Sequence, residues 1–169
     1  TLIVLAKHKP PVYDQAGIRL ITSGYRRPGP DVLDPKIHHN NLINSILAKI
    51  QANAAGADDA LMLDGRGFIA ETNATHVFFV AAGIVLTPYP VACPEGITRS
   101  VVLQLCREHG IPCREGDFSL AELYRADEAF CTGTMGELTP IVEVDGRTIG
   151  RSDDRPLLKR LTAFFREVT

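Results

Sequence analysis

Apolar residues along the chain follow two spacings, and the alternation between them predicts short strands mixed with amphipathic helices. Helical spacing marks residues 40–56, residues 98–109 with Thr98 as a candidate N-cap, and residues 155–168. Ser119, followed three residues later by Glu122, is the signature of a capping box. The pattern therefore predicts three longer helices and one short helix.

Short apolar runs bounded by Gly, Pro, Asn and Asp predict the strands. These runs lie at residues 2–6, 17–24, 60–64, 68–71, 73–80, 84–87, 111–115, 128–132 and 139–144. Turn sequences at residues 65–67, 82–83 and 145–146 join neighbouring runs. Because the elements show no regular βαβ repeat, the sequence predicts an α+β fold with a mixed, barrel-like sheet in one domain, residues 1–169.

The first predicted strand, residues 2–6, follows directly on Thr1. Chains usually begin with a few loosely held polar residues. The sequence is therefore interpreted as part of a longer protein.

Composition narrows the class of protein. The 169 residues are 45% hydrophobic and 22% charged, which is typical of a soluble globular domain. A net charge of −2 argues against nucleic acid or an anionic membrane as the partner. No apolar run approaches the roughly 20 residues of a membrane span. Four scattered cysteines without CxxC spacing favour reduced thiols and a cytoplasmic location.

Two charged residues are candidates for chemistry. Lys36 follows Pro35, whose ring fixes the backbone, so the lysine lies on a defined turn. A desolvated lysine can act as a nucleophile. Glu71 ends an apolar strand, where its carboxylate could pair with a ligand cation. Each residue alone is more often a solvated surface group.

Two glycine-containing turns are candidates for binding an anion. Gly96, Ile97 and Thr98 open a helix, where free N–H groups and the helix dipole favour negative charge. Gly133 and Thr134 form a small-residue turn that a ligand can approach closely. A lysine, a carboxylate and two such turns together are what a protein needs to hold pyridoxal 5′-phosphate (PLP).

The order of these features resembles the class IV (fold type IV) PLP-dependent aminotransferases. Lys36 and Glu71 precede Gly-Ile-Thr-Arg at residues 96–99 and Gly-Thr-x-x-Glu-Leu-Thr-Pro at residues 133–140. The family includes branched-chain and D-amino-acid aminotransferases and aminodeoxychorismate lyases. The resemblance implies the larger, PLP-binding domain of that fold, without the family's smaller N-terminal domain, and it implies a homodimer.

The resemblance also implies a role for each candidate residue. Lys36 would form the Schiff base with PLP and carry protons between substrate and cofactor. Glu71 would pair with the pyridine nitrogen. The backbone of Thr134 and Met135 would face the substrate carboxylate. The phosphate would be held by Gly96, Ile97, Thr98, Gly133 and Thr134.

The implied function is transfer of an amino group between an amino acid, branched-chain-like, and a 2-oxo acid. Two alternatives stay open: a lyase of the aminodeoxychorismate type, which would use the same residues, and a non-catalytic fragment. Asn41 stands where many branched-chain enzymes carry a tyrosine, and Pro94 where an aliphatic residue often packs on the cofactor. The substrate side chain and the D or L configuration therefore stay open.

Histidines offer a further alternative, a metal site. His38 and His39 are adjacent, and His8, His76 or His109 could add ligands. Adjacent histidines on a loop rarely form a site without a third ligand at fixed spacing, so no metal is expected.

Overall fold

A mixed sheet forms the centre of the computed structural model, which describes residues 3–4, 12–14, 16–37, 39–150 and 154–169. In these ranges the strands are β1 (Ile18–Thr22), β2 (Asp59–Leu63), β3 (Ile69–Thr72), β4 (His76–Ala81), β5 (Ile84–Pro88), β6 (Cys113–Gly116), β7 (Glu128–Gly133), β8 (Glu137–Val144) and β9 (Arg147–Thr148). The helices are α1 (Ile43–Ala54), α2 (Ile97–Glu108), α3 (Leu120–Tyr124) and α4 (Pro156–Val168).

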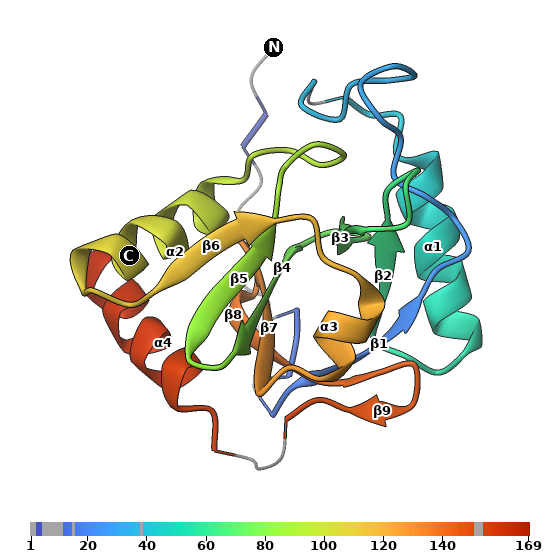
Figure 1. Ribbon diagram of the computed structural model, residues 1–169. Coiled ribbons are helices and arrows are strands. Elements are labelled where there is room, and N and C mark those ends of the chain that lie inside the picture. The colour runs from blue at the N-terminus through green and yellow to red at the C-terminus, as the bar shows by residue number, and fades with distance from the viewer. Residues whose placement is uncertain (1–2, 5–11, 15, 38, 151–153) are drawn as a thin grey trace.

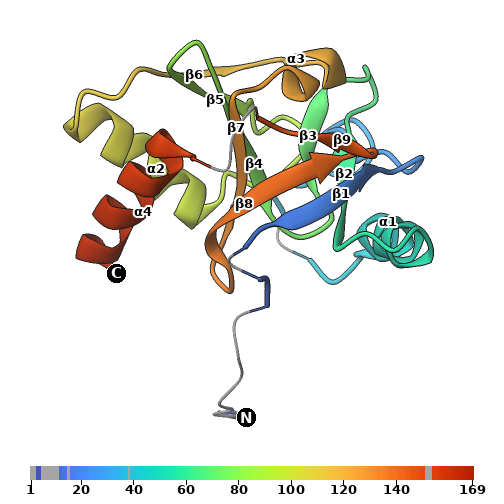
Figure 2. The same ribbon diagram turned by 90° about the horizontal axis from the view of Figure 1, so that it is seen from below.

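The strand order is β3-β2-β1-β8-β7-β4-β5-β6, with β9 paired to β8. The pair of β1 with β2, that of β1 with β8 and that of β5 with β6 are parallel, and the other pairs are antiparallel. Ala82 and Asp145 have positive φ and precede glycines, as tight hairpin turns require. The curled sheet in Figures 1 and 2 confirms the predicted mixed, barrel-like α+β fold.

Successive side chains along β4 and β7 point alternately into two hydrophobic cores. Val77, Phe79 and Cys131 belong to the core inside the curl, where Phe79 meets Phe118 edge-on at 5.1 Å. Phe78 stacks on the ring of β7's Phe130 at 5.2 Å in the second core, beneath α2 and α4. Alternation of side chains along the strands thus fills both faces of the sheet.

The helices cover the sheet in two places. Both views show α2 and α4 side by side against one face, while α1 lies beside β2 at the other end. Buried Glu128 accepts hydrogen bonds from the N–H groups of Leu157 (3.1 Å) and Leu158 (2.9 Å) at the start of α4. None of the helices in the described ranges is long and apolar enough to cross a membrane.

One predicted element differs from the structure, and another lies mostly outside the described residues. Helix α1 forms, but Ile43, Ile46 and Ile50 point outward and are each about half exposed. Ala48 and Ala52 face the sheet instead, because small side chains let the helix pack closely on β2. The predicted strand at residues 2–6 lies mostly outside the described residues, and the two described ones, at positions 3 and 4, are exposed and in no strand.

Candidate active site

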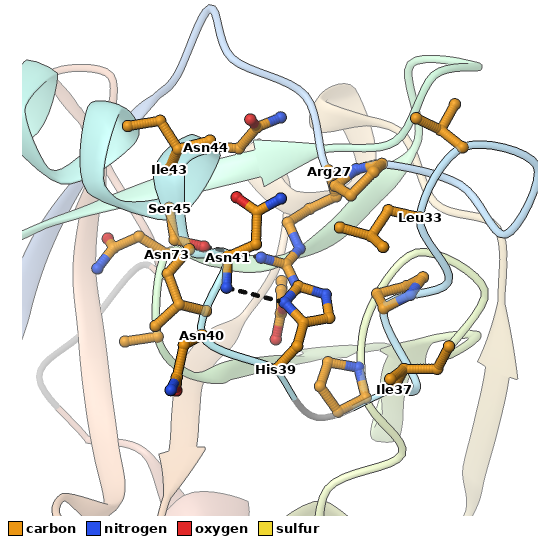
Figure 3. Close-up of a pocket in the computed structure, with 17 residues that line it drawn as sticks. Arg27, Leu33, Ile37, His39, Asn40, Asn41, Ile43, Asn44, Ser45 and Asn73 are labelled. Atoms are coloured by element: carbon orange, nitrogen blue, oxygen red, sulfur yellow. Dashed lines mark hydrogen bonds and ion pairs between the residues drawn. The ribbon is translucent and has the colours of Figure 1, made fainter.

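A pocket of about 550 Å³ opens between the loop that follows β1, the start of α1 and the end of β3. Figure 3 shows the labelled side chains around it, with His39 accepting a hydrogen bond from the Asn41 N–H (3.1 Å). Its size lies within the roughly 300–1,000 Å³ typical of small-molecule sites. Glu71 is the carboxylate that lines it.

Glu71 lies on the pocket wall as a buried ion pair. Its Oε1 is 2.6 Å from a terminal nitrogen of Arg27, and the two side chains are only 7% and 12% exposed. Arg27 is itself fixed, because it donates to the Ser45 hydroxyl (2.8 Å) and to the Ala92 carbonyl (3.2 Å). Burial raises the pKa of Glu71 to about 7, although the charge of Arg27 acts in the opposite direction.

The raised pKa of Glu71 predicts a pH-dependent loss of stability in the chain without ligand. A carboxyl group with a higher pKa in the folded state binds its proton more tightly there, so its contribution favours folding below pH 4.5 and declines up to about pH 7. The decline corresponds to about 3 kcal/mol. Urea unfolding at pH 5 and pH 8 should show this decline in the chain but not in Glu71→Gln. Parallel pH profiles would contradict it.

His76 joins the pocket to the two predicted anion-binding turns. Its Nε2 lies 3.9 Å from Oε2 of Glu71 and 2.8 Å from the Pro94 carbonyl oxygen, to which the neutral ring can donate. Burial lowers the pKa of the His76 imidazole, so the ring is uncharged at neutral pH. The ring also packs against Gly96, and His76 is paired with Thr132 across the sheet. The His76 ring therefore links the carboxylate of Glu71 to the start of α2, and its backbone lies beside the strand that leads into the second turn.

The turn between β3 and β4 holds Glu71 and His76 close together. The Thr72 N–H donates to the Thr75 carbonyl at 2.8 Å, and the Thr75 N–H donates to the Thr72 hydroxyl at 2.8 Å. This short connection brings the end of one strand beside the start of the next.

The start of α2 has free backbone donors that suit an anion. Gly96 is the N-cap with φ of 74°, so the prediction of Thr98 as N-cap is wrong by two residues. Among the described residues, no side chain caps this N-terminus. Ile97 is 86% exposed, and buried Arg99 pairs with Glu115. The N–H groups of the first turn are therefore available to a phosphate.

Gly96 is a position where any side chain should be harmful. A Cβ there would overlap the His76 ring, and positive φ strains residues other than glycine. We expect Gly96→Ala to lower the free energy of unfolding by about 2–4 kcal/mol. Gly110→Ala is the matched control, because Gly110 also has positive φ (63°) but open space around it. Equal losses in urea unfolding of the two variants would contradict the packing argument.

The second predicted turn follows β7. The Gly136 N–H donates to the Gly133 carbonyl at 3.2 Å, which closes a tight turn around Thr134 and Met135. Both of these side chains are exposed, Met135 to 73%. A Cβ on Gly133 would lie 3.0 Å from the Thr75 methyl group, so the turn packs closely beside the β3–β4 connection.

Lys36 lies next to the pocket on an exposed turn. Its neighbours Pro35 and Ile37 line the main pocket, whereas Lys36 itself lines a separate hollow with Tyr89. The structure thus brings together the carboxylate and the two turns, with the lysine loop alongside.

Sequence reasoning missed the site roles of Arg27 and His76. Nothing in the local sequence of Arg27 marks a partner 44 positions away. Among the other histidines, His109 stacks on Phe164 at the opposite end of α2. His8 and His38 lie outside the described residues.

Comparison with known proteins identifies the family. The model of the class IV amino-transferases matches residues 1–144. Branched-chain-amino-acid aminotransferase-like protein 2 of Arabidopsis thaliana is 51% identical over 170 residues, all of this chain but 30% of the relative. The branched-chain amino acid aminotransferase of Thermobaculum terrenum, solved in its PLP form, has a TM-score of 0.86 and 36% identity, over 90% of this chain and 50% of its own.

A third similar protein is also a branched-chain aminotransferase. The branched-chain aminotransferase of Thermoproteus uzoniensis, solved with norvaline, has a TM-score of 0.89 and 33% identity, over 94% of this chain and 53% of its own. The chain therefore spans between 30% and 53% of the length of these relatives. Because the family model matches most of the chain and these relatives share its sequence and fold, the chain belongs to the class IV aminotransferase family.

Proposed function

We propose that this chain is the larger, PLP-binding part of an enzyme that moves an amino group between a branched-chain-like amino acid and a 2-oxo acid. The observation that carries the proposal is the joining of buried Glu71, through His76, to the uncapped start of α2. A carboxylate and an anion site in one place suit a cofactor with a basic nitrogen and a phosphate. The ligands in the structures of the two solved relatives, PLP in one and norvaline in the other, support it.

The residues present fit PLP. The carboxylate of Glu71 would hold the pyridine nitrogen, and the positive charge there would lower the raised pKa of the carboxyl group. The phosphate would bind the first-turn N–H groups of α2 at Ile97 and Thr98, with Gly133 and Thr134 beside them. When bound, the cofactor supplies an electron sink for the charge that develops on the substrate carbon.

Lys36 would supply the base of the reaction. Its amine lies on a turn that Asp34 fixes by accepting the Lys36 N–H at 3.0 Å. From this loop its amine would be bonded to the cofactor at rest and would be displaced by the substrate amine. The freed Lys36 amine would then accept a proton from the substrate Cα and return it to the cofactor carbon. The backbone of the turn at exposed Thr134 and Met135 would face the substrate carboxylate.

Amino transfer and lyase chemistry can be separated by their products. The full-length protein with a branched-chain amino acid and 2-oxoglutarate should release the branched 2-oxo acid and glutamate. Release of pyruvate from aminodeoxychorismate, without amino transfer, would support the lyase instead. Absence of both reactions in protein that binds PLP would support a non-catalytic role.

The outward face of α1 supports a homodimer in the full-length protein. Ile46 and Ile50 are each about half exposed on this helix, and Leu42 and Ile43, at its start beside the pocket, are equally exposed. Exposed apolar patches commonly mark interfaces. Ile46→Glu should convert a dimer to a monomer in light scattering, and an unchanged mass would contradict this placement.

All four cysteines are free thiols, which supports a cytoplasmic location.

A further inference from the structure

Three side chains with different metal-binding atoms meet beside the pocket. A carboxylate oxygen of Glu71, a ring nitrogen of His76 and the sulfur of Cys93 all lie within 4.8 Å of one another. They come from the end of β3, the start of β4 and the loop before α2. Glu71 and Cys93 are buried, and the His76 side chain is 12% exposed.

This set of atoms suits zinc. Zinc is bound by sulfur, nitrogen and oxygen at about 2.0–2.3 Å, which places tetrahedral ligands about 3.3–3.8 Å apart. The two ligand atoms that lie farthest apart would therefore have to approach each other by about 1 Å to bind one zinc ion. Glu71 lines the pocket, so a water molecule could complete the coordination from that side.

Each ligand atom can be supplied without breaking the ion pair on the pocket wall. Oε1 of Glu71 is occupied by Arg27, but Oε2 faces His76 at 3.9 Å. The Nε2 atom of His76 would exchange the Pro94 carbonyl for the ion, and the ring proton would move to Nδ1. The Cys93 thiol would release its proton to solvent.

The charges around the cluster can be summed. A Cys93 thiolate and the Glu71 carboxylate together offset both charges of a divalent ion. Arg99 is balanced by Glu115, whereas Arg27 shares the carboxylate of Glu71 with the ion. The occupied cluster together with Arg27 would therefore carry one net positive charge.

We propose that Glu71, His76 and Cys93 form a binding site for zinc or a similar thiophilic divalent cation, and that this cation and PLP exclude each other. Exclusion follows because Arg27 occupies Oε1 of Glu71, which leaves Oε2 as the oxygen that both the ion and the pyridine nitrogen require. The metal site stands on the cluster alone, whereas the exclusion rests on the proposed function.

Cobalt(II), a spectroscopic substitute for zinc, tests the metal site. Titration of the PLP-free chain should give a thiolate-to-cobalt charge-transfer band that saturates at one equivalent and is reversed by zinc. Cys93→Ser and His76→Gln should each weaken or abolish the band. Cys131→Ser is the matched control, because Cys131 is equally buried but outside the cluster. No band, or an unchanged band in Cys93→Ser, would overturn the site.

Competition with PLP tests the exclusion. With free zinc at ten times its Kd, the apparent Kd of the chain for PLP should rise about 11-fold, and in Cys93→Ser it should not change. Simultaneous binding of both ligands, with unchanged affinities, would overturn the exclusion. If the chain bound cobalt but never PLP, the proposed function and the exclusion would both be contradicted, whereas the metal site would stand.

Discussion

Replacing Lys36 with alanine in the full-length protein is expected to abolish amino transfer. Positioned general-base catalysis alone contributes about 10²–10⁴-fold, and Lys36 would also supply the covalent attachment of the cofactor. Its exposed position on the turn after buried Pro35 makes a folding defect a weak explanation for the loss. Turnover and the visible absorbance of lysine-bound PLP should disappear together.

The matched control is Lys159→Ala. Lys159 is also exposed, and its ammonium pairs with Asp154 on the surface, near the start of α4. Surface ion pairs of this kind contribute little to stability. Activity and absorbance should be unchanged in this control. Normal turnover in Lys36→Ala would contradict the assignment of the base.

Replacing Glu71 with glutamine is expected to slow single-turnover proton transfer about 10²–10³-fold. The carboxylate would stabilise positive charge on the pyridine ring most strongly as the substrate carbon becomes negative, so it acts on the transition state. A neutral amide keeps the shape but loses that charge. The Kd for PLP should therefore change less than the rate does.

Glu128→Gln is the control that separates the loss of a catalytic charge from a loss of fold stability. Glu128 is as deeply buried as Glu71, but its carboxylate holds the start of α4. Its replacement should lower the stability of the fold and leave the single-turnover rate of the folded protein unchanged. Equal slowing in both variants, or an unchanged rate in Glu71→Gln, would contradict the proposed role of Glu71.

Local sequence signals predicted the elements of the fold well. The capping box of Ser119 and Glu122 forms as predicted, with Ser119 donating through both its N–H and its hydroxyl. The hairpin turns at residues 82–83 and 145–146 also form. These features are determined by residues close together in the chain, so they can be predicted from short sequence motifs.

Contacts between residues far apart in the chain could not be predicted from the sequence. The partnership of Arg27 with Glu71 depends on how the loop after β1 passes over β3. The direction in which α1 faces depends on how closely the helix packs on β2. Its isoleucines, which an amphipathic helix would ordinarily turn toward the core, lie on the outer face instead. Residues such as His76 acquire their neighbours only when strand order brings β4, β7 and α2 together.

The most direct test of the proposed function is the absorbance spectrum of the purified chain with PLP, followed by borohydride reduction and peptide mapping. The proposal predicts a visible band that saturates at one equivalent and a reduced label on Lys36. Repeating the experiment with the full-length protein tests whether further residues are needed to hold the phosphate. If the full-length protein gave no band, or a label spread over surface lysines, the proposed function would be contradicted.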